Sequence, residues 1–345
     1  MHPVAWVGWL SAALIGLSAT RNPLHLLLIL LCIAMVNGTL GAKRELPHAP
    51  VSPVRFALFV VPLSALFNGL TAHFGDTVLV RLPAGLPILG GPVTLEALVF
   101  GMINGLVLSG IFAAFTLFSR ALSVPALIRL IPRAFYPVAV VVSIGVTFVP
   151  VTMRQFQQIR EAQAIRGHRL RSLRDWVPLF IPLLIGGLER ALQLAEAMTA
   201  RGFASVGQAS ENTAGRSAIV LGLVALLSGW LLRLVWGQEI LGWGLLLLGV
   251  AFILGSLWVL GRLIPRTAYR SWPWTRWDSV ATLGAAVVVA AFVVPGFAQP
   301  SFYYYPYPAL SLPGFDPRMG VALLGLLGPA FLSSGAALEE RTGNA

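Results

Sequence analysis

Two arginines, Arg166 and Arg201, end two stretches of sequence that read almost alike: EAQAIRG at Glu161–Gly167 and EAMTARG at Glu196–Gly202. A guanidinium group presents a planar fork of hydrogen-bond donors that binds a carboxylate through two bonds at once. The chemistry that these residues offer is therefore recognition of acidic groups on a partner. Charged residues make up only 11% of the chain, so a repeated charged heptapeptide points to a specific role.

Both heptapeptides have the composition of a helix end. Glu, Ala, Gln and Met favour helix, and a glycine after the arginine accepts the left-handed conformation just past the last turn. We predict that helices end at Gly167 and Gly202, with each arginine on the last turn, where a cation complements the helix dipole. The small residues that would let a neighbour approach are Ala162, Ala164, Ala197 and Ala200. Capping alone explains one copy, whereas two copies favour a pair of docking ends.

No catalytic constellation accompanies these arginines. The sequence contains no HExxH, paired-aspartate or Ser-His arrangement, and it lacks a Walker A motif. Its single cysteine, Cys32, lies in an apolar run, which leaves neither a disulfide framework nor a thiolate metal site. The histidines are scattered at His2, His25, His48, His73 and His168. We therefore expect a non-catalytic chain without a cofactor or a metal.

The composition indicates whether the elements that carry the arginines lie in water or in a membrane. Apolar residues make up 57% of the chain and the mean hydropathy is +0.81, values typical of an integral membrane protein. Backbone groups in lipid must be satisfied within each segment, and the alternation of a barrel strand is not visible. We predict an all-α, polytopic membrane helical bundle. The net charge of +11 follows the positive-inside rule, with no indication of nucleic-acid binding.

Eight apolar runs are candidate membrane spans. They are Pro3–Ala19, Pro23–Gly38, Val54–Phe74, Ala97–Phe118, Ser217–Trp236, Leu241–Leu260, Val280–Phe297 and Met319–Leu338. Arginines and lysines cluster in three of the connecting loops, which strict alternation places on one side, and the positive-inside rule makes that side the cytoplasm. We expect a multi-pass protein of the cell membrane with both termini in the cytoplasm. The aromatic stretch at Ser301–Pro308 then faces the outer interface.

The middle of the chain does not fit this alternation. Phe135–Val149 and Trp176–Leu188 are apolar but short and contain prolines, and a crossing at the first would place six following arginines outside. We expect neither run to cross. Each would form the apolar base of a long helix in or near the membrane plane, and Arg166 and Arg201 would emerge together below the inner leaflet. The chain then divides into an N-terminal transmembrane bundle (1–120), a coupling-helix module (121–207) and C-terminal transmembrane helices (208–345).

The double signature resembles that of the transmembrane T component of energy-coupling factor transporters, a type of ABC transporter in which two Ala-Arg-Gly signatures close two long coupling helices. VTLEALVFGMINGLVLSGIFAAF at Val93–Phe115 and SVPALIRLIP at Ser123–Pro132 are also similar to segments of that family. The likeness covers Pro3–Phe203 and, more loosely, the chain from about Tyr269 onward. One departure is Ile165 in place of an alanine. The apolar hairpin at Ser217–Leu260 looks additional, and its role stays open.

The resemblance implies a scaffold without chemistry of its own. Two ABC ATPase subunits, identical or different, would dock on the coupling ends, and a membrane-embedded S component would hold a vitamin or a metal ion and lean on the apolar bases. ATP would then draw the two ends toward each other. The residues implied in ATPase coupling are Ala164, Ile165, Arg166, Gly167, Ala200, Arg201 and Gly202, with Glu161 and Glu196 in support.

Other interpretations also fit part of the sequence. A secondary transporter or another polytopic permease would place acidic residues near the bilayer midplane, and the candidate spans are almost free of them away from their ends. Glu189 and Glu196 could pair with Arg160 or Arg154 across the two long helices, although a solvated face is the favoured interpretation. Glu96 begins a span, where a helix N-terminus favours a carboxylate for structural reasons.

Overall fold

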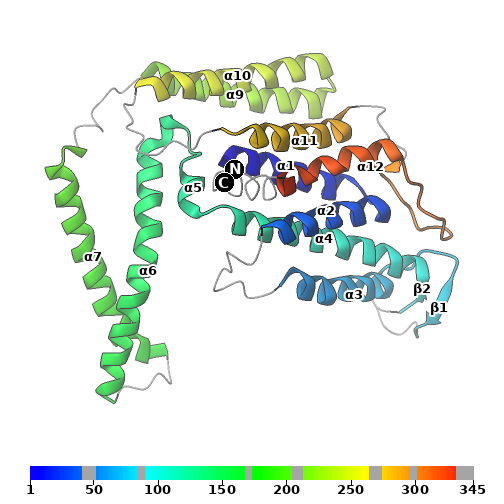
Figure 1. Cartoon of the computed structure of the whole chain (residues 1–345), viewed down its shortest axis with the longest axis horizontal. Helices are drawn as coiled ribbons and strands as arrows, with labels where there is room; N and C mark the ends of the chain where they lie inside the picture. The colour runs from blue at the N-terminus through cyan, green and yellow to red at the C-terminus, as the bar shows by residue number, and fades with distance from the viewer. Residues whose placement is uncertain are drawn as a thin grey trace, which may run out of the picture. The chain divides into compact units, whose positions relative to one another are not determined.

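The computed structural model describes residues 1–40, 52–83, 90–167, 173–203, 213–263, 274–294 and 301–331, and the described part is almost entirely helical (Figure 1). Seven of its helices are long and apolar enough to cross a membrane: Pro53–Thr71, Leu95–Ala121, Arg133–Ile165, Arg174–Ala200, Ser217–Trp236, Glu239–Arg262 and Arg276–Val293. Three shorter apolar helices are Pro3–Ala19, Pro23–Thr39 and Pro317–Phe331. The predicted all-α membrane fold is confirmed.

All eight predicted spans coincide with helices, although the last residues of Val280–Phe297 and Met319–Leu338 lie outside the described residues. The two additional long helices are those of the middle of the chain, Arg133–Ile165 and Arg174–Ala200. Length and composition alone would allow both to cross a membrane. That they lie along it instead stays a prediction, which rests on the arginines that follow them.

The chain forms two compact units. One contains Met1–Ser123 and Arg270–Ala345, and the other contains Val124–Tyr269. The sequence suggests three consecutive modules instead. The structure groups the last helices of the chain with the N-terminal bundle, and it groups the apolar hairpin with the two long middle helices.

The first unit is built from helices that begin at polar caps. Its elements are α1 (Pro3–Ala19), α2 (Pro23–Thr39), α3 (Pro53–Thr71), α4 (Leu95–Ala121), α11 (Arg276–Val293), α12 (Pro317–Leu323) and the 3₁₀ turn η5 (Leu324–Leu327). Thr275 caps α11 in a reciprocal capping box with Asp278. The Asp278 carboxylate also accepts the His2 backbone N–H at 2.8 Å, which ties α11 to the start of α1. The buried Trp9 donates its indole N–H to the Leu326 carbonyl at 2.8 Å. These contacts join segments from opposite ends of the chain.

A short antiparallel hairpin of β1 (Val78–Arg81) and β2 (Pro92–Thr94) precedes α4. Glu96, in the first turn of α4, is fully buried, and both carboxylate oxygens accept the Thr77 backbone N–H, at 3.1 and 3.3 Å. Glu96 lies at the helix N-terminus as the sequence predicts, and its carboxylate also holds the loop before the hairpin against the first turn of α4.

The aromatic stretch that was expected at the outer interface packs on the turn between α1 and α2. The Phe302 carbonyl accepts the backbone N–H of Arg21 at 2.8 Å, and the Asn22 side chain donates to the Ser301 carbonyl at 2.9 Å. Tyr304 is buried and donates its hydroxyl to the Ser311 carbonyl at 2.7 Å, and burial raises the pKa of this phenol. Tyr303, in contrast, is exposed.

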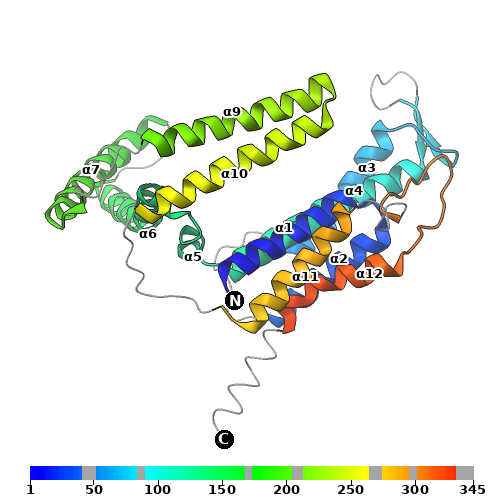
Figure 2. The ribbon, with the colours of Figure 1, turned by 90° about the horizontal axis from the view of Figure 1, so that it is seen from above.

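The second unit contains two antiparallel helix pairs. Its elements are α5 (Val124–Ile128), the 3₁₀ turns η2 (Arg133–Phe135) and η3 (Leu173–Trp176), α6 (Tyr136–Ile165), α7 (Val177–Ala200), α9 (Thr213–Trp236) and α10 (Glu239–Leu263). Figure 2 shows α9 and α10 running side by side. They pack closely because Gly222 faces Gly249 and Gly229 faces Gly242, where a Cβ would lie within about 3 Å of the facing backbone.

Candidate functional site

The first arginine signature ends α6 as the sequence predicts. The helix ends at Ile165, and Arg166 caps it with φ −77° and ψ 6°. Gly167 follows in the left-handed region at φ +79°, and its N–H donates to the Ala164 carbonyl at 3.0 Å. Apart from Gly167 and its chain neighbours, no atom of the described residues lies within 4 Å of the position that a Cβ would take there, and it is the positive φ that favours glycine.

The second signature repeats this geometry at the end of α7. Arg201 caps the helix with φ −85° and ψ 7°, Gly202 has φ +76°, and its N–H donates to the Thr199 carbonyl at 2.9 Å. The two heptapeptides therefore produce the same local structure, and the prediction that helices end at Gly167 and Gly202 is confirmed. Each arginine leaves the last turn in the same way relative to its own helix.

Both signatures are exposed. Arg166, Arg201 and the residues that accompany them, Ala164, Ala200, Glu161 and Glu196, all have exposed side chains. Ile165, which stands where the family has an alanine, is 88% exposed, and its side chain is the bulkiest apolar feature of the first end. Exposed guanidinium groups beside small or apolar side chains are available to a partner that offers both carboxylates and apolar contact.

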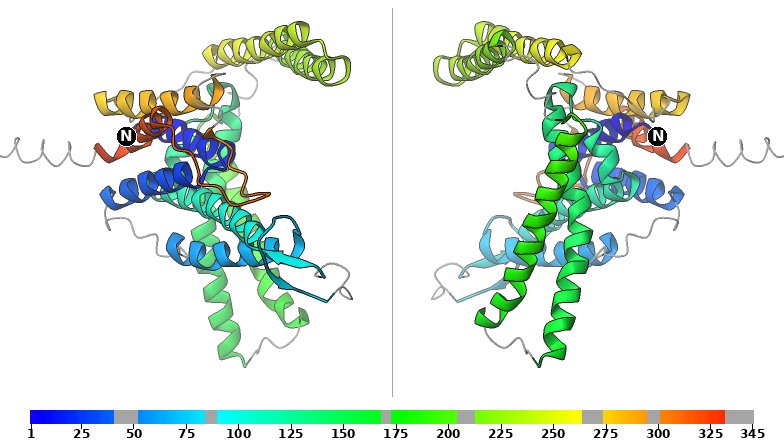
Figure 3. Two further views of the ribbon diagram at one scale, coloured as in Figure 1. Left: turned by 90° about the vertical axis from the view of Figure 1, so that its right-hand side faces the viewer. Right: turned by 90° about the vertical axis from the view of Figure 1, so that its left-hand side faces the viewer.

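The two signatures lie at opposite ends of one antiparallel helix pair. Figure 3 shows α6 and α7 running alongside each other in opposite directions. The Tyr136 and Phe203 rings, at the start of α6 and past the end of α7, lie 6.3 Å apart between centroids. Since α6 contains 30 residues, it separates Arg166 from Arg201 by about 45 Å.

This separation corrects the expectation that Arg166 and Arg201 emerge together. The next helical turn, η3, begins at Leu173, only a few residues after Gly167, so the chain returns along α6. Both signatures are C-terminal helix ends, and in an antiparallel pair the C-terminal ends point in opposite directions. A pair that lies along the membrane surface could still present both arginines to the cytoplasm, but it would present them at two distant places.

A polar contact joins the middle of the two helices. Arg190 of α7 donates to the Gln155 side-chain oxygen of α6 at 3.0 Å, and the Gln155 amide nitrogen lies against Gly186, where an added Cβ would force the Gln155 side chain to move. The other terminal nitrogen of Arg190 is buried without a hydrogen-bond partner in the described part of the chain. The two helices thus approach each other closely at Gly186, whereas a Cβ on the adjacent Gly187 would meet no atom from elsewhere in the described part of the chain within 4 Å.

The charge pairs considered across the two helices do not form among the described residues. Glu189 and Glu196 of α7 are exposed, as are Arg154 and Arg160 of α6, and the structure shows none of the ion pairs considered between them. This agrees with the favoured interpretation of a solvated face.

The apolar surfaces of α6 and α7 are largely uncovered by the described residues of the second unit. No residue of α6 is buried, and in α7 only Leu179 is. Near the first arginine end, Trp176 stacks on Phe156 with 6.3 Å between ring centroids, and an apolar hollow of about 490 Å³ is lined by Trp176, Val177, Phe180 and Ile181. Surfaces of this kind need lipid or another protein to cover them.

The fold and the two arginine ends define a class of transporter membrane component. The family model described as "CbiQ: Cobalt transport protein" matches residues 3–214, more than half of the 345-residue chain, and the chain belongs to this family. The match confirms the resemblance to T components. It covers α1 to α7 with both arginine signatures, whereas the α9–α10 hairpin lies almost entirely beyond it.

Curated relatives carry the name energy-coupling factor transporter transmembrane protein EcfT. The chain is 27% identical over 201 residues to EcfT 1 of Listeria monocytogenes, which covers 52% of this chain and 69% of that protein. It is 31% identical over 167 residues to EcfT of Leuconostoc gelidum, covering 41% of this chain and 62% of that protein. The match to Bacillus subtilis EcfT is 26% over 208 residues, covering 53% and 78% of the two chains.

Proposed function

We propose that this chain is the membrane scaffold subunit of an energy-coupling factor importer. It would transmit the ATP-driven motion of two ABC ATPase subunits to a membrane-embedded S component. The observation that carries the proposal is the pair of exposed arginine ends, Arg166 and Arg201, held about 45 Å apart by the length of α6. At that distance each of two ATPase subunits would have its own docking end. A single shared site would not separate them in this way.

Each docking end would act by charge and by shape. The Arg166 or Arg201 guanidinium would enter a groove that offers carboxylates, and Ala164 or Ala200 would allow the groove to close around the helix end. Ile165 makes the first end bulkier than the second, so the two ends would seat their ATPases differently. Glu161 and Glu196, about one turn before the signatures, would support docking by pairing with basic residues at the rim of the groove.

ATP-driven approach of the two ATPases would apply force at both ends of the α6–α7 pair. The helices would slide on each other at the contact of Gln155 with Gly186 and Arg190, where one Arg190 nitrogen is buried and unpaired among the described residues. The S component would rest on the uncovered apolar faces of α6 and α7 and would be reoriented by this movement. The chain itself would remain non-catalytic, since hydrolysis takes place on the ATPases.

The substrate would be a vitamin or a metal ion held by the S component. The family description names cobalt transport, which supports a metal ion as one of the two classes. Within the described residues no group of three or more histidine, cysteine or acidic side chains could hold a metal ion.

The test is charge reversal at the docking ends. The double variant R166E/R201E should lose the ATPase subunits during purification from mild detergent, because acidic grooves would repel the new carboxylates. The variant R154E changes an exposed arginine in the body of α6 and should retain them. Retention of both ATPases by R166E/R201E, in a protein that inserts normally, would contradict the proposed docking role.

A further inference from the structure

The apolar hairpin beyond the family match carries two arginine–tryptophan pairs, one toward each end of α10. The Arg233 guanidinium lies 4.6 Å from the centre of the Trp243 ring, and the Arg262 guanidinium lies 3.5 Å from the centre of the Trp258 ring. Both arrangements are cation–π contacts. The second pair differs from the first because a cavity and another arginine adjoin it.

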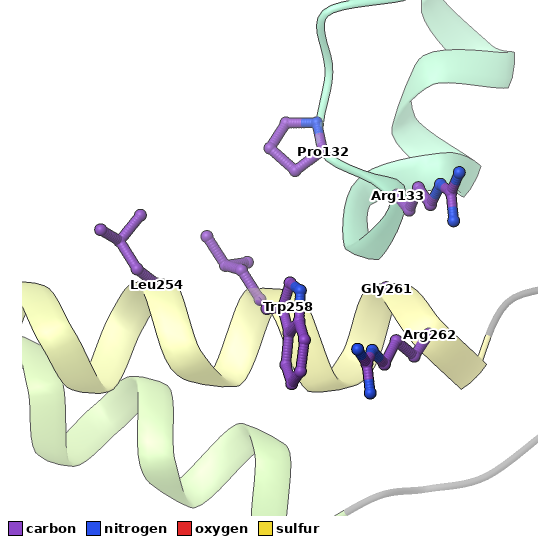
Figure 4. A pocket seen from close by; sticks show the side chains of 7 residues that line it. Pro132, Arg133, Leu254, Trp258, Gly261 and Arg262 are labelled. Atoms are coloured by element: carbon purple, nitrogen blue, oxygen red, sulfur yellow. The ribbon is translucent and has the colours of Figure 1, made fainter.

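The cavity lies where the 3₁₀ turn η2 meets the last turns of α10 (Figure 4). Its volume is about 430 Å³, and its lining residues are Pro132, Arg133, Leu254, Leu257, Trp258, Gly261 and Arg262. Gly261 is buried and allows the close approach, since a Cβ there would meet the Cβ of Arg133 at 3.2 Å. All of these residues belong to the second compact unit.

The lining separates into a cationic part and an apolar part. Arg133 and Arg262 are both exposed and contribute two guanidinium groups. The apolar part consists of Leu254, Leu257 and Trp258, which is 59% exposed and has the Arg262 guanidinium over one face of its ring (Figure 4). A ligand that satisfies both parts has a negatively charged head and a hydrocarbon tail. A small free anion would leave the apolar wall uncovered.

The position of the cavity on α10 agrees with such a ligand. The apolar part of α10, Glu239–Arg262, is long enough to cross a membrane, and Arg262 lies in its last turn with Trp258 one turn before it. Tryptophan and arginine at the end of an apolar helix are typical of the membrane–water interface. The predicted orientation places Arg133 and Arg262 on the cytoplasmic side, where the leaflet carries anionic lipids.

We propose that the cavity between η2 and α10 binds an anionic phospholipid of the inner leaflet. The phosphate of the headgroup lies between Arg133 and Arg262, and one acyl chain lies along Leu254, Leu257 and the Trp258 ring. Because η2 continues directly into α6, the bound lipid contacts the root of that helix as well as the hairpin. This gives the additional hairpin a role as one wall of a lipid site.

The test measures lipid binding to the purified full-length chain in mild detergent by native mass spectrometry. The probes are phosphatidylglycerol, phosphatidylcholine with the same acyl chains, and inorganic phosphate. We expect tighter binding of phosphatidylglycerol than of phosphatidylcholine, and no release of the bound lipid by phosphate. The variant R133A/R262A should bind phosphatidylglycerol roughly 25-fold more weakly, since each basic side chain near an anionic lipid contributes a factor of about five.

Two further variants make the result specific. R133K/R262K keeps both charges and should retain binding to within a few fold, which separates loss of charge from loss of fold. R233A removes the cation of the pair on Trp243 and should bind phosphatidylglycerol as the unchanged chain does. Equal binding by R133A/R262A and the unchanged chain, equal binding of the two lipids, an equal loss in R233A, or displacement by inorganic phosphate would each overturn the proposal.

Discussion

The Tyr136 and Phe203 rings lie 6.3 Å apart between centroids, although Tyr136 begins α6 and Phe203 follows the end of α7. This contact fixes the antiparallel sense of the two helices. It places the second arginine signature beside the root of α6 and the first signature at the far end of the same helix. The docking ends are thus separated by one helix length.

The first prediction concerns that separation. Spin labels on Ile165→Cys and Ala200→Cys, in a chain with Cys32 replaced by alanine, should lie about 40 Å apart, because α6 rises 1.5 Å for each residue. Labels on Phe156→Cys and Trp176→Cys, whose rings stack at 6.3 Å, provide the short control distance. Electron paramagnetic resonance measures both distances. A distance for the first pair as short as that of the control would mean that the two signatures emerge together.

The second prediction concerns the left-handed glycines. Gly167→Ala should strain the end of α6 by about 1 to 2 kcal/mol, because a Cβ crowds the next carbonyl oxygen at φ +79°. The end of the helix would unwind and misdirect Arg166, so fewer ATPase subunits should co-purify with the variant. Gly167→Asn is the matched control, since asparagine accepts this conformation more readily and should retain the ATPases. Equal retention by both variants would show that the glycine is dispensable.

The third prediction concerns the contact between the two ends of the chain. Trp9→Phe removes the donor to the Leu326 carbonyl and should lower stability by about 1 kcal/mol, because a buried hydrogen bond between α1 and η5 is lost. Trp236→Phe changes an exposed indole and should have little effect. Thermal unfolding in detergent compares the two variants. A larger loss for Trp236→Phe would mean that α1 and η5 are not packed as described.

The structure shows which features can be read from local sequence. The ends of α6 and α7 depend on an arginine, a glycine and the preceding helix formers, so a heptapeptide is enough to predict them. The placement of Glu96 in the first turn of α4 is local in the same sense, whereas its bond to the Thr77 backbone, 19 residues away, is not. The bond between His2 and Asp278 joins residues 276 positions apart and has no signal in either segment.

The antiparallel relation of the two arginine ends also has a signal in the sequence. The interval between Gly167 and Trp176 is too short for a second long helix to run parallel to the first. That interval therefore favours an antiparallel pair, with its C-terminal ends apart. The contact between Gln155 and Arg190 could not have been predicted, because many residues of α6 and α7 have the right chemistry and only the packing selects this pair.

The fourth prediction concerns orientation. In the chain with Cys32 replaced, a membrane-impermeant maleimide added to intact cells should label Tyr303→Cys and not Ile165→Cys, because the positive-inside rule places the arginine-rich middle of the chain in the cytoplasm. Both side chains are exposed in the structure, so accessibility within the protein does not bias the comparison. Permeabilised cells should allow labelling of both. Labelling of Ile165→Cys alone in intact cells would contradict this orientation and would mean that the topology is the reverse of the predicted one.

The measurement that tests the central claim most directly is site-specific photocrosslinking in membranes that contain the partner proteins. A photoreactive residue replaces Ile165 in one variant and Ala200 in another, and Val141, an exposed apolar position on α6, is the control. We predict that the first two variants each capture a protein with a Walker A motif and that the control does not. Capture of no ATPase at either end, or equal capture at Val141, would contradict the docking of two ATPases on Arg166 and Arg201.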